Sequence, residues 1–515
     1  MVSWLKDAVF YEIYPQSFND TNGDGIGDLN GIIEKLDYIK GMGCNAIWIN
    51  PCFDSPFGDA GYDVRDYYLI AERYGTNDDA KRLFEEAHKR GMHIFLDLVP
   101  GHTSVEHKWF IESCKDEKNE FTDRYVWSDS IWEDPTPLAS LRGISERSGS
   151  VGVNFFSFQP ALNYGFYNCE KPWQQPMDAP GPQASLAAMK DVMRFWLSMG
   201  CDGFRVDMAH SMVKNDPESK GTIALWQNVR EFLNKEYPNC ALISEWGEPD
   251  KAIEGGFHMD FVLHFGPSHY GDLFRGDTPY FSKNGGGDIK AFVDKYSQLI
   301  AAANKRGYVC IPSSNHDMPR LSSKLDVEEI KMAFGFILTM PGVPFIYYGD
   351  EIGMRYQEEL KSLEGGYERT GSRTPMQWTQ GENMGFSTAS ADKLYLPVDT
   401  EEGRRDVESQ MAADDSIYAE VVKLIEIRNA HPAFANDSDV EFVYVEEKAY
   451  PFAYLKTSED GSEKVMVIIN PSLNDVSFET EYKLSEAFYV RGEAPVQNGT
   501  TVNVKARSIA FVTVE

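Results

Sequence analysis

Residues 183–210 read QASLAAMKDVMRFWLSMGCDGFRVDMAH and contain the helix-strand unit from which we predict the fold. In residues 183–200 apolar side chains return every three or four positions, which predicts an amphipathic helix. Residues 203–210 form a short apolar run that ends in polar residues, as in a buried strand. Side chains two positions apart on a strand share a face, so Arg205 and Asp207 point the same way. A cation and a carboxylate together on such a strand indicate that this face lines a site.

The same unit recurs along the first 350 residues of the chain. Amphipathic stretches such as residues 78–91 connect short apolar runs, and a repeated strand-helix-strand pattern predicts parallel strands. Eight such strands close into a barrel, so we predict an α/β fold with a (β/α)8 TIM barrel. Besides 203–210, the runs are AVFYEIY (8–14), NAIWINP (45–51), HIFLDLVPGH (93–102), ALISEW (241–246), MDFVLHF (259–265), YVCIPSSNHD (308–317) and PFIYYGDEIG (344–353).

Two segments depart from this repeat. Residues 104–180 are rich in Gly, Pro, Ser and Trp and are too long for an ordinary connection, which predicts a small domain inserted after the third strand. From residue 431 to 515 alternating runs separated by turns predict a C-terminal antiparallel β-sandwich. The barrel is therefore expected to comprise residues 1–103 and 181–430.

The composition limits the class of partner. The 515 residues carry a formal net charge of −31, with 42% hydrophobic and 25% charged residues. Such an acidic surface repels nucleic acids and anionic membranes and leaves a neutral sugar unaffected. We expect a neutral small-molecule substrate, no nucleic acid or membrane partner, and a monomer.

The cysteines and the N-terminal sequence bear on the compartment. Seven cysteines are dispersed without a C-x-x-C pair, which favours neither a zinc site nor a disulfide framework and suits a reducing compartment. The first residues, MVSWLKDAVFYEIYPQSF, lack the apolar region of a signal peptide. We expect a cytoplasmic protein, or a secreted one if a signal peptide has been removed.

Polar side chains gather where the predicted strands end, which is where barrel enzymes carry their chemistry. Carboxylates that meet from different strands suit the cleavage of glycosidic bonds, which needs a nucleophile or base and a proton donor. An adjacent cation lowers the pKa of a carboxyl group, so Arg205 is expected to keep Asp207 ionised. The polar residues at these ends are Asp97, His102, Arg205, Asp207, His210, Glu245, Asn315, His316 and Asp317.

The motifs DLVPGH, GFRVD, ISEW and SSNHD, in this order, resemble the signature regions of the α-amylase superfamily, glycoside hydrolase family thirteen. QPALN at 159–163 resembles a fifth region, and the likeness extends over residues 8–510. Within the superfamily the chain resembles the branch of oligo-1,6-glucosidases and α-glucosidases. The resemblance implies a retaining hydrolase acting on short malto- or isomalto-oligosaccharides.

The resemblance also implies roles for individual residues. Asp207 would be the nucleophile, Glu245 the general acid/base, and Asp317 the group that stabilises the transition state. Glu248 competes for the acid role, but Glu245 ends the apolar run whereas Glu248 lies in the following loop. The residues expected to bind the sugar before the scissile bond are His102, Arg205 and His316, with Tyr62 stacked on its ring.

A second motif, D-x-N-x-D-x-I-x-D, spans residues 20–28. Oxygen ligands at alternate positions, with glycines that allow a tight turn, can wrap a hard cation. The motif resembles the structural Ca²⁺ loop of the oligosaccharide-cleaving branch. The expected ligands are Asp20, Asn22, Asp24 and Asp28, with the backbone carbonyl of Ile26.

Two further motifs bear on where a glucan is cut. GYD at 61–63 and GSRTPMQW at 371–378 resemble the pair that closes the sugar pocket of exo-acting α-glucosidases. We therefore expect Asp63 and Arg373 to pair beside the terminal glucose, and the enzyme to release glucose from the non-reducing end.

Three positions differ from the family pattern. Gly101 replaces an Asn that helps to hold a second Ca²⁺ in true α-amylases, so that ion is not expected here. Ala161 replaces a common Asp, and Met208 follows the nucleophile where Val or a small residue tracks linkage preference. The linkage stays open, as do alternatives such as a maltose-forming α-amylase, a transglucosidase, and a trehalose synthase or sucrose isomerase. A non-catalytic transporter subunit is disfavoured, because such relatives carry a membrane anchor and lack the full triad.

Overall fold

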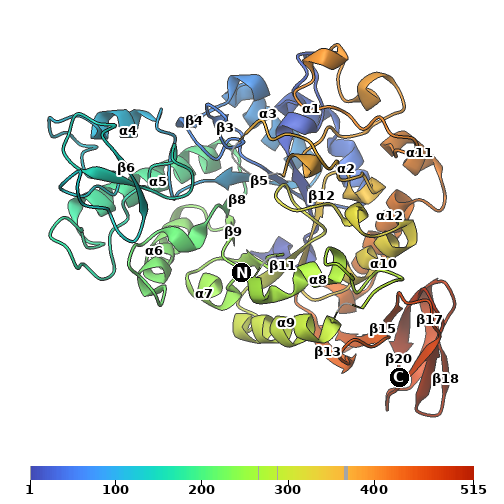
Figure 1. Cartoon of the computed structure of the whole chain (residues 1–515). Helices are drawn as coiled ribbons and strands as arrows, with labels where there is room; N and C mark the ends of the chain where they lie inside the picture. The colour runs from blue at the N-terminus through green and yellow to red at the C-terminus, as the bar shows by residue number, and fades with distance from the viewer. Residues whose placement is uncertain (1, 265, 287, 365–368) are drawn as a thin grey trace.

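The computed structural model describes residues 2–264, 266–286, 288–364 and 369–515 (Figure 1). Eight parallel strands form a closed barrel in the order β1-β12-β11-β10-β9-β8-β5-β2. Each predicted run overlaps one of them, which confirms the TIM barrel; Phe265, the last residue of its run, lies outside the described residues. The strands are β1 (Phe10–Ile13), β2 (Ala46–Ile49), β5 (His93–Leu98), β8 (Gly203–Val206), β9 (Ala241–Ser244), β10 (Met259–Phe261), β11 (Tyr308–Pro312) and β12 (Val343–Tyr347).

Helices surround the barrel, and their apolar faces pack on it. The predicted helix at 183–200 is α5, which begins with Pro180 and ends before Gly200, whose left-handed backbone (φ 116°) favours glycine. The others around the barrel are α1 (Leu29–Glu34), α2 (Leu36–Met42), α3 (Asn77–Lys89), α6 (Lys220–Glu236), α7 (Pro249–Glu254), α8 (Tyr270–Phe274), α9 (Ile289–Ala303), α10 (Val327–Ile337), α11 (Val407–Ala412) and α12 (Ile417–Ala430). No helix among the described residues is both long and apolar enough to cross a bilayer.

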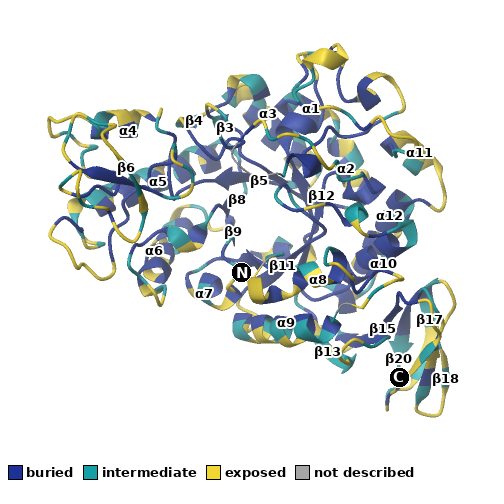
Figure 2. Cartoon of the chain, viewed as in Figure 1, coloured by how far each residue is buried: buried dark blue, intermediate teal, exposed yellow. Residues whose placement is uncertain are grey.

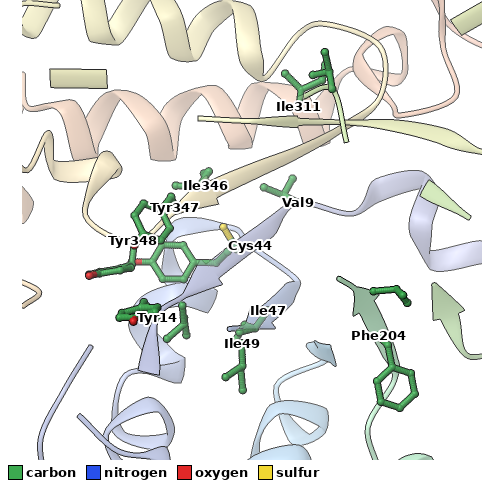
Figure 3. Close-up of a cluster of buried hydrophobic side chains, with 14 of the residues drawn as sticks. Val9, Tyr14, Cys44, Ile47, Ile49, Phe204, Ile311, Ile346, Tyr347 and Tyr348 are labelled. Atoms are coloured by element: carbon green, nitrogen blue, oxygen red, sulfur yellow. The ribbon is translucent and has the colours of Figure 1, made fainter. Parts of the chain in front are cut away.

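Along each barrel strand, side chains point alternately into the barrel and outward toward the helices. Large side chains such as Trp48 and Met259 fill the interior, where Phe10 and Phe345 stack with ring centroids 4.4 Å apart. The intervening residues, among them Ile47, Phe204 and Ile346, point outward under the helices (Figure 3). The barrel strands are consequently buried, apart from the half-buried His93 at the start of β5. Exposed residues concentrate on the outer faces of the helices, on loops and on the C-terminal sheets (Figure 2).

The chain between β5 and α5 forms a separate lobe at the left of Figure 1. It contains α4 (Lys108–Ser113) and the antiparallel pair β6 (Ala139–Arg142) and β7 (Ser150–Val153). Ala161 is fully buried in its small core of Val126, Phe166 and Trp173, so the position that is commonly Asp in the family is apolar packing here. A further small pair, β3 (Phe53–Asp54) and β4 (Asp66–Ile70), follows β2.

The C-terminal region forms two antiparallel sheets, as predicted. The first has the order β13-β14-β15-β20-β17, and the second has the order β16-β19-β18. Leu455, Met466 and Val512 of the first sheet pack on Phe478 and Val502 of the second. The strands are β13 (Asp439–Tyr444), β14 (Phe452–Thr457), β15 (Lys464–Asn470), β16 (Val476–Glu479), β17 (Leu484–Arg491), β18 (Val496–Asn498), β19 (Thr501–Val504) and β20 (Ser508–Val514).

The opening glycine of β8 gives a test of barrel packing. A Cβ added at Gly203 would lie 2.2 Å from the Ala241 carbonyl oxygen and 2.4 Å from a ring carbon of Phe95. Gly203→Ala should therefore lower the free energy of unfolding by about 1–3 kcal/mol or more, measured by denaturant unfolding. The exposed helical Gly41 has open space around it, so Gly41→Ala should be neutral or stabilise by up to about 1 kcal/mol. Equal stability of the two variants would contradict this account of the barrel.

Candidate active site

The side chain of Arg205 is the centre of a buried charge cluster at the carboxyl ends of three neighbouring strands. Residue 205 pairs with Asp97 across β5 and β8, and β9 flanks β8 on the other side. The guanidinium lies 2.8 Å from Asp97, 3.1 Å from Asp207 and 2.8 Å from Glu245. The strand order thus brings together three carboxylates that are far apart in sequence.

The electrostatics of this cluster correct one expectation. Burial, followed by the negative charge of Glu245, raises the pKa of Asp207 well above its usual value, although Arg205 opposes the shift. Burial likewise raises the pKa of Asp97 to about 7. The expected lowering at Asp207 fails because burial and the charge of Glu245 together outweigh the effect of Arg205. Each carboxyl group of the cluster that is ionised favours a substrate that becomes positively charged as it reacts.

The backbone immediately after β8 contacts the Glu245 carboxylate. Met208 has a left-handed conformation (φ 42°, ψ 43°), and its N–H donates to Glu245 Oε2 at 3.1 Å. The Glu245 side chain is 24% exposed and that of Asp207 is 9% exposed, so Glu245 is the more accessible of the two. The competing Glu248 is at the start of α7, half exposed and paired with Lys251 at 2.8 Å.

Asp317 has its own set of cations. Arg369 and Arg373 each donate to Asp317 Oδ1 at 2.7 Å, and His316 Nε2 lies 3.3 Å from Oδ2. Burial alone would raise the pKa of Asp317, but the Arg369 and Arg373 guanidinium groups, which stay charged beside the neutral His316 ring, hold it well below its usual value. Asn315 Oδ1 accepts the Asp317 backbone N–H at 2.9 Å and shapes the turn that carries this carboxylate.

The aromatic and imidazole side chains connect the two carboxylate groups. The Tyr62 hydroxyl lies 2.7 Å from His316 Nε2 and 3.2 Å from Asp97 Oδ2, and its ring stacks on His316 at 5.6 Å. His102 Nε2 lies 3.1 Å from the Tyr62 carbonyl oxygen. Burial lowers the pKa of His102 to about 4 and that of His316 well below its usual value. Both rings are therefore neutral hydrogen-bonding groups at pH 7.

Two polar residues beneath His316 were missed in the sequence. Glu12 Oε1 lies 2.9 Å from His316 Nδ1 and accepts from Asn50 Nδ2 at 3.2 Å. Both Glu12 and Asn50 are fully buried at the ends of β1 and β2. The sequence did contain a signal for Glu12, because it is a carboxylate inside the apolar run AVFYEIY. An isolated buried charge is costly, so such a residue indicates a polar partner in the fold.

The expected pair of Asp63 and Arg373 is wrong. Asp63 is fully buried and accepts from Ser55 Oγ at 3.0 Å and from the N–H groups of Gly58 and Asp59 at 2.8 and 3.0 Å, so it shapes the preceding turn. Arg373 donates to Asp317 and to the His316 carbonyl.

The carboxylate–guanidinium pair is instead formed by Asp59 and Arg369, at 2.6 Å. Each lies four residues before the residue that was predicted. Because a second residue of the required type lies just before each motif, the sequence alone could not choose between the two pairs. Arg369 also contacts Asp317, so the pair is continuous with the carboxylate cluster.

A match to a protein-family model shows the family to which the chain belongs. The family described as alpha amylase, catalytic domain, matches residues 12–437, which include every carboxylate of the cluster. The chain belongs to the alpha-amylase family. It is a glycoside-hydrolase-type enzyme.

Relatives within the alpha-amylase family have more than one activity in their names. An oligo-1,6-glucosidase of Heyndrickxia coagulans is 32% identical, with 93% of this chain and 94% of the relative covered. A trehalose synthase/amylase of Mycolicibacterium smegmatis is 33% identical, with 84% and 77% covered. A solved structure of an isomaltulose synthase mutant from Erwinia rhapontici NX5, in complex with sucrose, has a TM-score of 0.81 at 26% identity and covers 100% of this chain and 99% of that chain.

The positions that depart from the alpha-amylase family pattern lie together where the barrel meets the inserted lobe. A Cβ at Gly101 would lie 2.7 Å from Asn154 Nδ2. Asn154 also contacts His102 Nδ1 at 3.2 Å, and the buried Lys214 amine lies 3.3 Å from Asn154 Oδ1. Burial lowers the pKa of Lys214 to about 8. The Asn154 amide thus occupies the space beside Gly101 and would have to move to admit the asparagine side chain of the family pattern. The nearby His210 is exposed at this rim.

The 20–28 loop has the oxygen donors that a hard cation prefers, and they shape the loop. Asp20 accepts from the N–H groups of Asn22, Gly23 and Gly25 at 2.8–3.0 Å, and Asp28 accepts from Thr21. The donor set fits Ca²⁺, for which Asp20, Asn22, Asp24, Asp28 and the Ile26 carbonyl would be the ligands in a structural role. Across residues 2–264, 266–286, 288–364 and 369–515, however, no three His, Cys, Asp or Glu side chains are grouped for metal binding. Calcium therefore stays a prediction.

Calcium binding to this loop can be tested by thermal unfolding. If the loop binds Ca²⁺, a concentration one hundred times the Kd should stabilise the protein by about 2.7 kcal/mol, and a chelator should remove that gain. Asp24→Ala should abolish the Ca²⁺ effect while activity at low temperature persists. Identical melting curves with Ca²⁺ and with chelator would contradict the site, and complete loss of activity in the chelated, folded protein would contradict a structural role.

Proposed function

We propose that this enzyme is a retaining α-glucoside hydrolase that removes glucose from the non-reducing ends of short malto- or isomalto-oligosaccharides. The observation that carries the proposal is the Arg205 guanidinium, which contacts both Asp207 and Glu245. Two carboxyl groups that share one guanidinium suit the separation of about 5–5.5 Å found in retaining enzymes. An inverting enzyme needs a wider gap, about 6.5–9.5 Å, to hold a water molecule.

The proposed reaction has two displacements. In the first, an Asp207 oxygen attacks the anomeric carbon while Glu245 donates its proton to the glycosidic oxygen. The bond between the anomeric carbon and the glycosidic oxygen breaks. A glucosyl ester of Asp207 forms, and the remaining sugar leaves. In the second, the Glu245 carboxylate takes a proton from water, the water oxygen attacks the anomeric carbon, and the ester bond breaks. Two inversions restore the original configuration.

Charge placement supports these roles. The positive charge that develops on the glucosyl ring in the transition state of each displacement is stabilised by the ionised Asp317, whose pKa is held low by neighbouring cations. The raised pKa of Asp207 makes its carboxylate a stronger base than an ordinary one. Attack by Asp207 on the sugar requires a pH high enough to ionise the carboxyl group. We therefore infer that activity falls with acidification at a higher pH than an unperturbed aspartate would give.

A second candidate function uses the same covalent intermediate. If a sugar hydroxyl replaces water in the second displacement, the enzyme transfers or isomerises glucosides. The trehalose synthase and isomaltulose synthase relatives favour this alternative, whereas the oligo-1,6-glucosidase relatives favour hydrolysis. Products from maltose, isomaltose, trehalose and sucrose distinguish the two, since hydrolysis gives free glucose and transfer gives a new disaccharide.

Substitution of the two carboxylates tests the mechanism. Asp207→Asn should lower kcat by about 10⁴-fold or more, and Glu245→Gln should lower it by about 10²–10⁴-fold on an unactivated glucoside. Glu248→Gln is the matched control and should retain native activity. NMR of the first product should show the α-anomer of glucose. Initial release of β-glucose, or substantial turnover by folded Asp207→Asn, would contradict double displacement.

The pair of Asp59 and Arg369 should decide where a chain is cut. We expect it to hydrogen-bond the terminal glucose and to close the pocket, so that reducing-end-labelled maltopentaose or isomaltopentaose shortens by one glucose at a time. Asp59→Ala should lower kcat/KM by about 10- to 100-fold, the effect of losing a charged hydrogen bond. The exposed pair of Arg65 and Asp54 supplies the control Arg65→Ala, which should leave the pattern unchanged. Immediate labelled maltose or maltotriose from the native enzyme would mean an open cleft.

A further inference from the structure

A buried carboxylate behind the barrel wall contacts the residues on both sides of Glu245. Glu245 directly follows β9, and β10 pairs with β9 so that Asp260 lies beside Ser244. Asp260 Oδ1 accepts from Ser244 Oγ at 2.7 Å and from the Trp246 backbone N–H at 3.0 Å. These two contacts fix the backbone immediately before and immediately after Glu245.

The position of Asp260 keeps it away from substrate. The interior of the barrel is filled by Ile243, Met259 and Phe261, and the intervening Ser244 and Asp260 therefore point outward from the wall. Asp260 is fully buried there. Burial raises its pKa to about 7, against the hydrogen bonds from Ser244 and the loop N–H groups. A buried carboxyl group is costly, so its retention at this place calls for a role that an apolar side chain could not supply.

The Glu245 side chain is already held at its far end. Arg205 contacts Glu245 Oε2 at 2.8 Å, and the Met208 N–H donates to the same oxygen at 3.1 Å. The Ala209 N–H donates to the Glu245 carbonyl at 3.2 Å from the β8 side. Asp260 supplies the corresponding restraint from the β10 side. A general acid has to be held to within about 0.5 Å for efficient proton transfer, so restraints on both ends of the residue have a direct chemical consequence.

We propose that Asp260 is a positioning residue for proton transfer, which aims the Glu245 carboxyl group at the glycosidic oxygen by fixing Ser244 and Trp246. The proposal rests on the proposed function in one respect, namely that Glu245 is the general acid. It adds a residue that touches neither substrate nor the reacting atoms.

The chemistry of the leaving group separates this role from a merely structural one. Fluoride departs from α-glucosyl fluoride without protonation, whereas the sugar alcohol that leaves a disaccharide needs a proton from the acid. Misplacement of Glu245 therefore slows cleavage of the disaccharide and spares formation of the glucosyl ester from the fluoride. A general loss of folded protein slows both substrates by the same factor.

The experiment compares kcat/KM on the best disaccharide with kcat/KM on α-glucosyl fluoride. Asp260→Ala should lower the disaccharide value by about 10- to 100-fold and the fluoride value by no more than about threefold. Asp260→Asn keeps an acceptor oxygen and should restore most of the disaccharide activity. Ser244→Ala removes one of the two donors to Asp260 and is the second variant if Asp260→Ala does not fold. It should lower the ratio of the disaccharide kcat/KM to the fluoride kcat/KM by a smaller factor.

Glu351 offers a matched control elsewhere in the fold. It is a fully buried carboxyl group that accepts from Tyr11 and Tyr38 at 2.7 Å on one oxygen, and burial raises its pKa to about 7. Glu351→Ala should change both substrates by one common factor. Equal losses on both substrates for folded Asp260→Ala and Ser244→Ala, or native ratios in both, would overturn the proposal. Glu245→Gln is measured alongside: if it spares the disaccharide, the proposed function fails, and if it alone shows the leaving-group effect, only the role of Asp260 fails.

Discussion

The contact of one buried guanidinium with three carboxylates is the interaction on which the site depends. Arg205 holds Asp97, Asp207 and Glu245 at the ends of β5, β8 and β9. Removing one partner of a buried ion pair costs about 3–5 kcal/mol, because the remaining charge stays desolvated. The same contact therefore joins three barrel strands and sets the spacing of the two carboxylates that would perform the chemistry.

Asp207 and Asp317 are placed in opposite electrostatic environments. Asp207 shares its cation with two other carboxylates, and burial raises its pKa. Asp317 contacts two guanidinium groups, those of Arg369 and Arg373, and its pKa is lowered. Carboxyl groups of the same type can thus differ in protonation within one pocket, which is how a single site can supply groups with different roles.

The inserted lobe reaches the site through polar side chains. Gln159 donates to Asp59 at 2.9 Å, and Asn154 contacts His102 at 3.2 Å. Asp59 in turn pairs with Arg369, and Arg369 pairs with Asp317, so the lobe is connected to Asp317 through these contacts. The arrangement of Asp59, Arg369 and Asp317 consequently depends on how the lobe is seated on the barrel.

The sequence by itself determined the barrel, the C-terminal sheets and the residues at the strand ends, because the periodicity of apolar residues is local and motifs such as GFRVD keep their order along the chain. Only the tertiary structure decided that the expected pair joins Asp59 to Arg369 rather than Asp63 to Arg373. It also decided the direction of the Asp207 pKa shift and the place of Asp260 behind Glu245. Partners and desolvation depend on segments that are distant in sequence, and a one-dimensional pattern does not contain those distances.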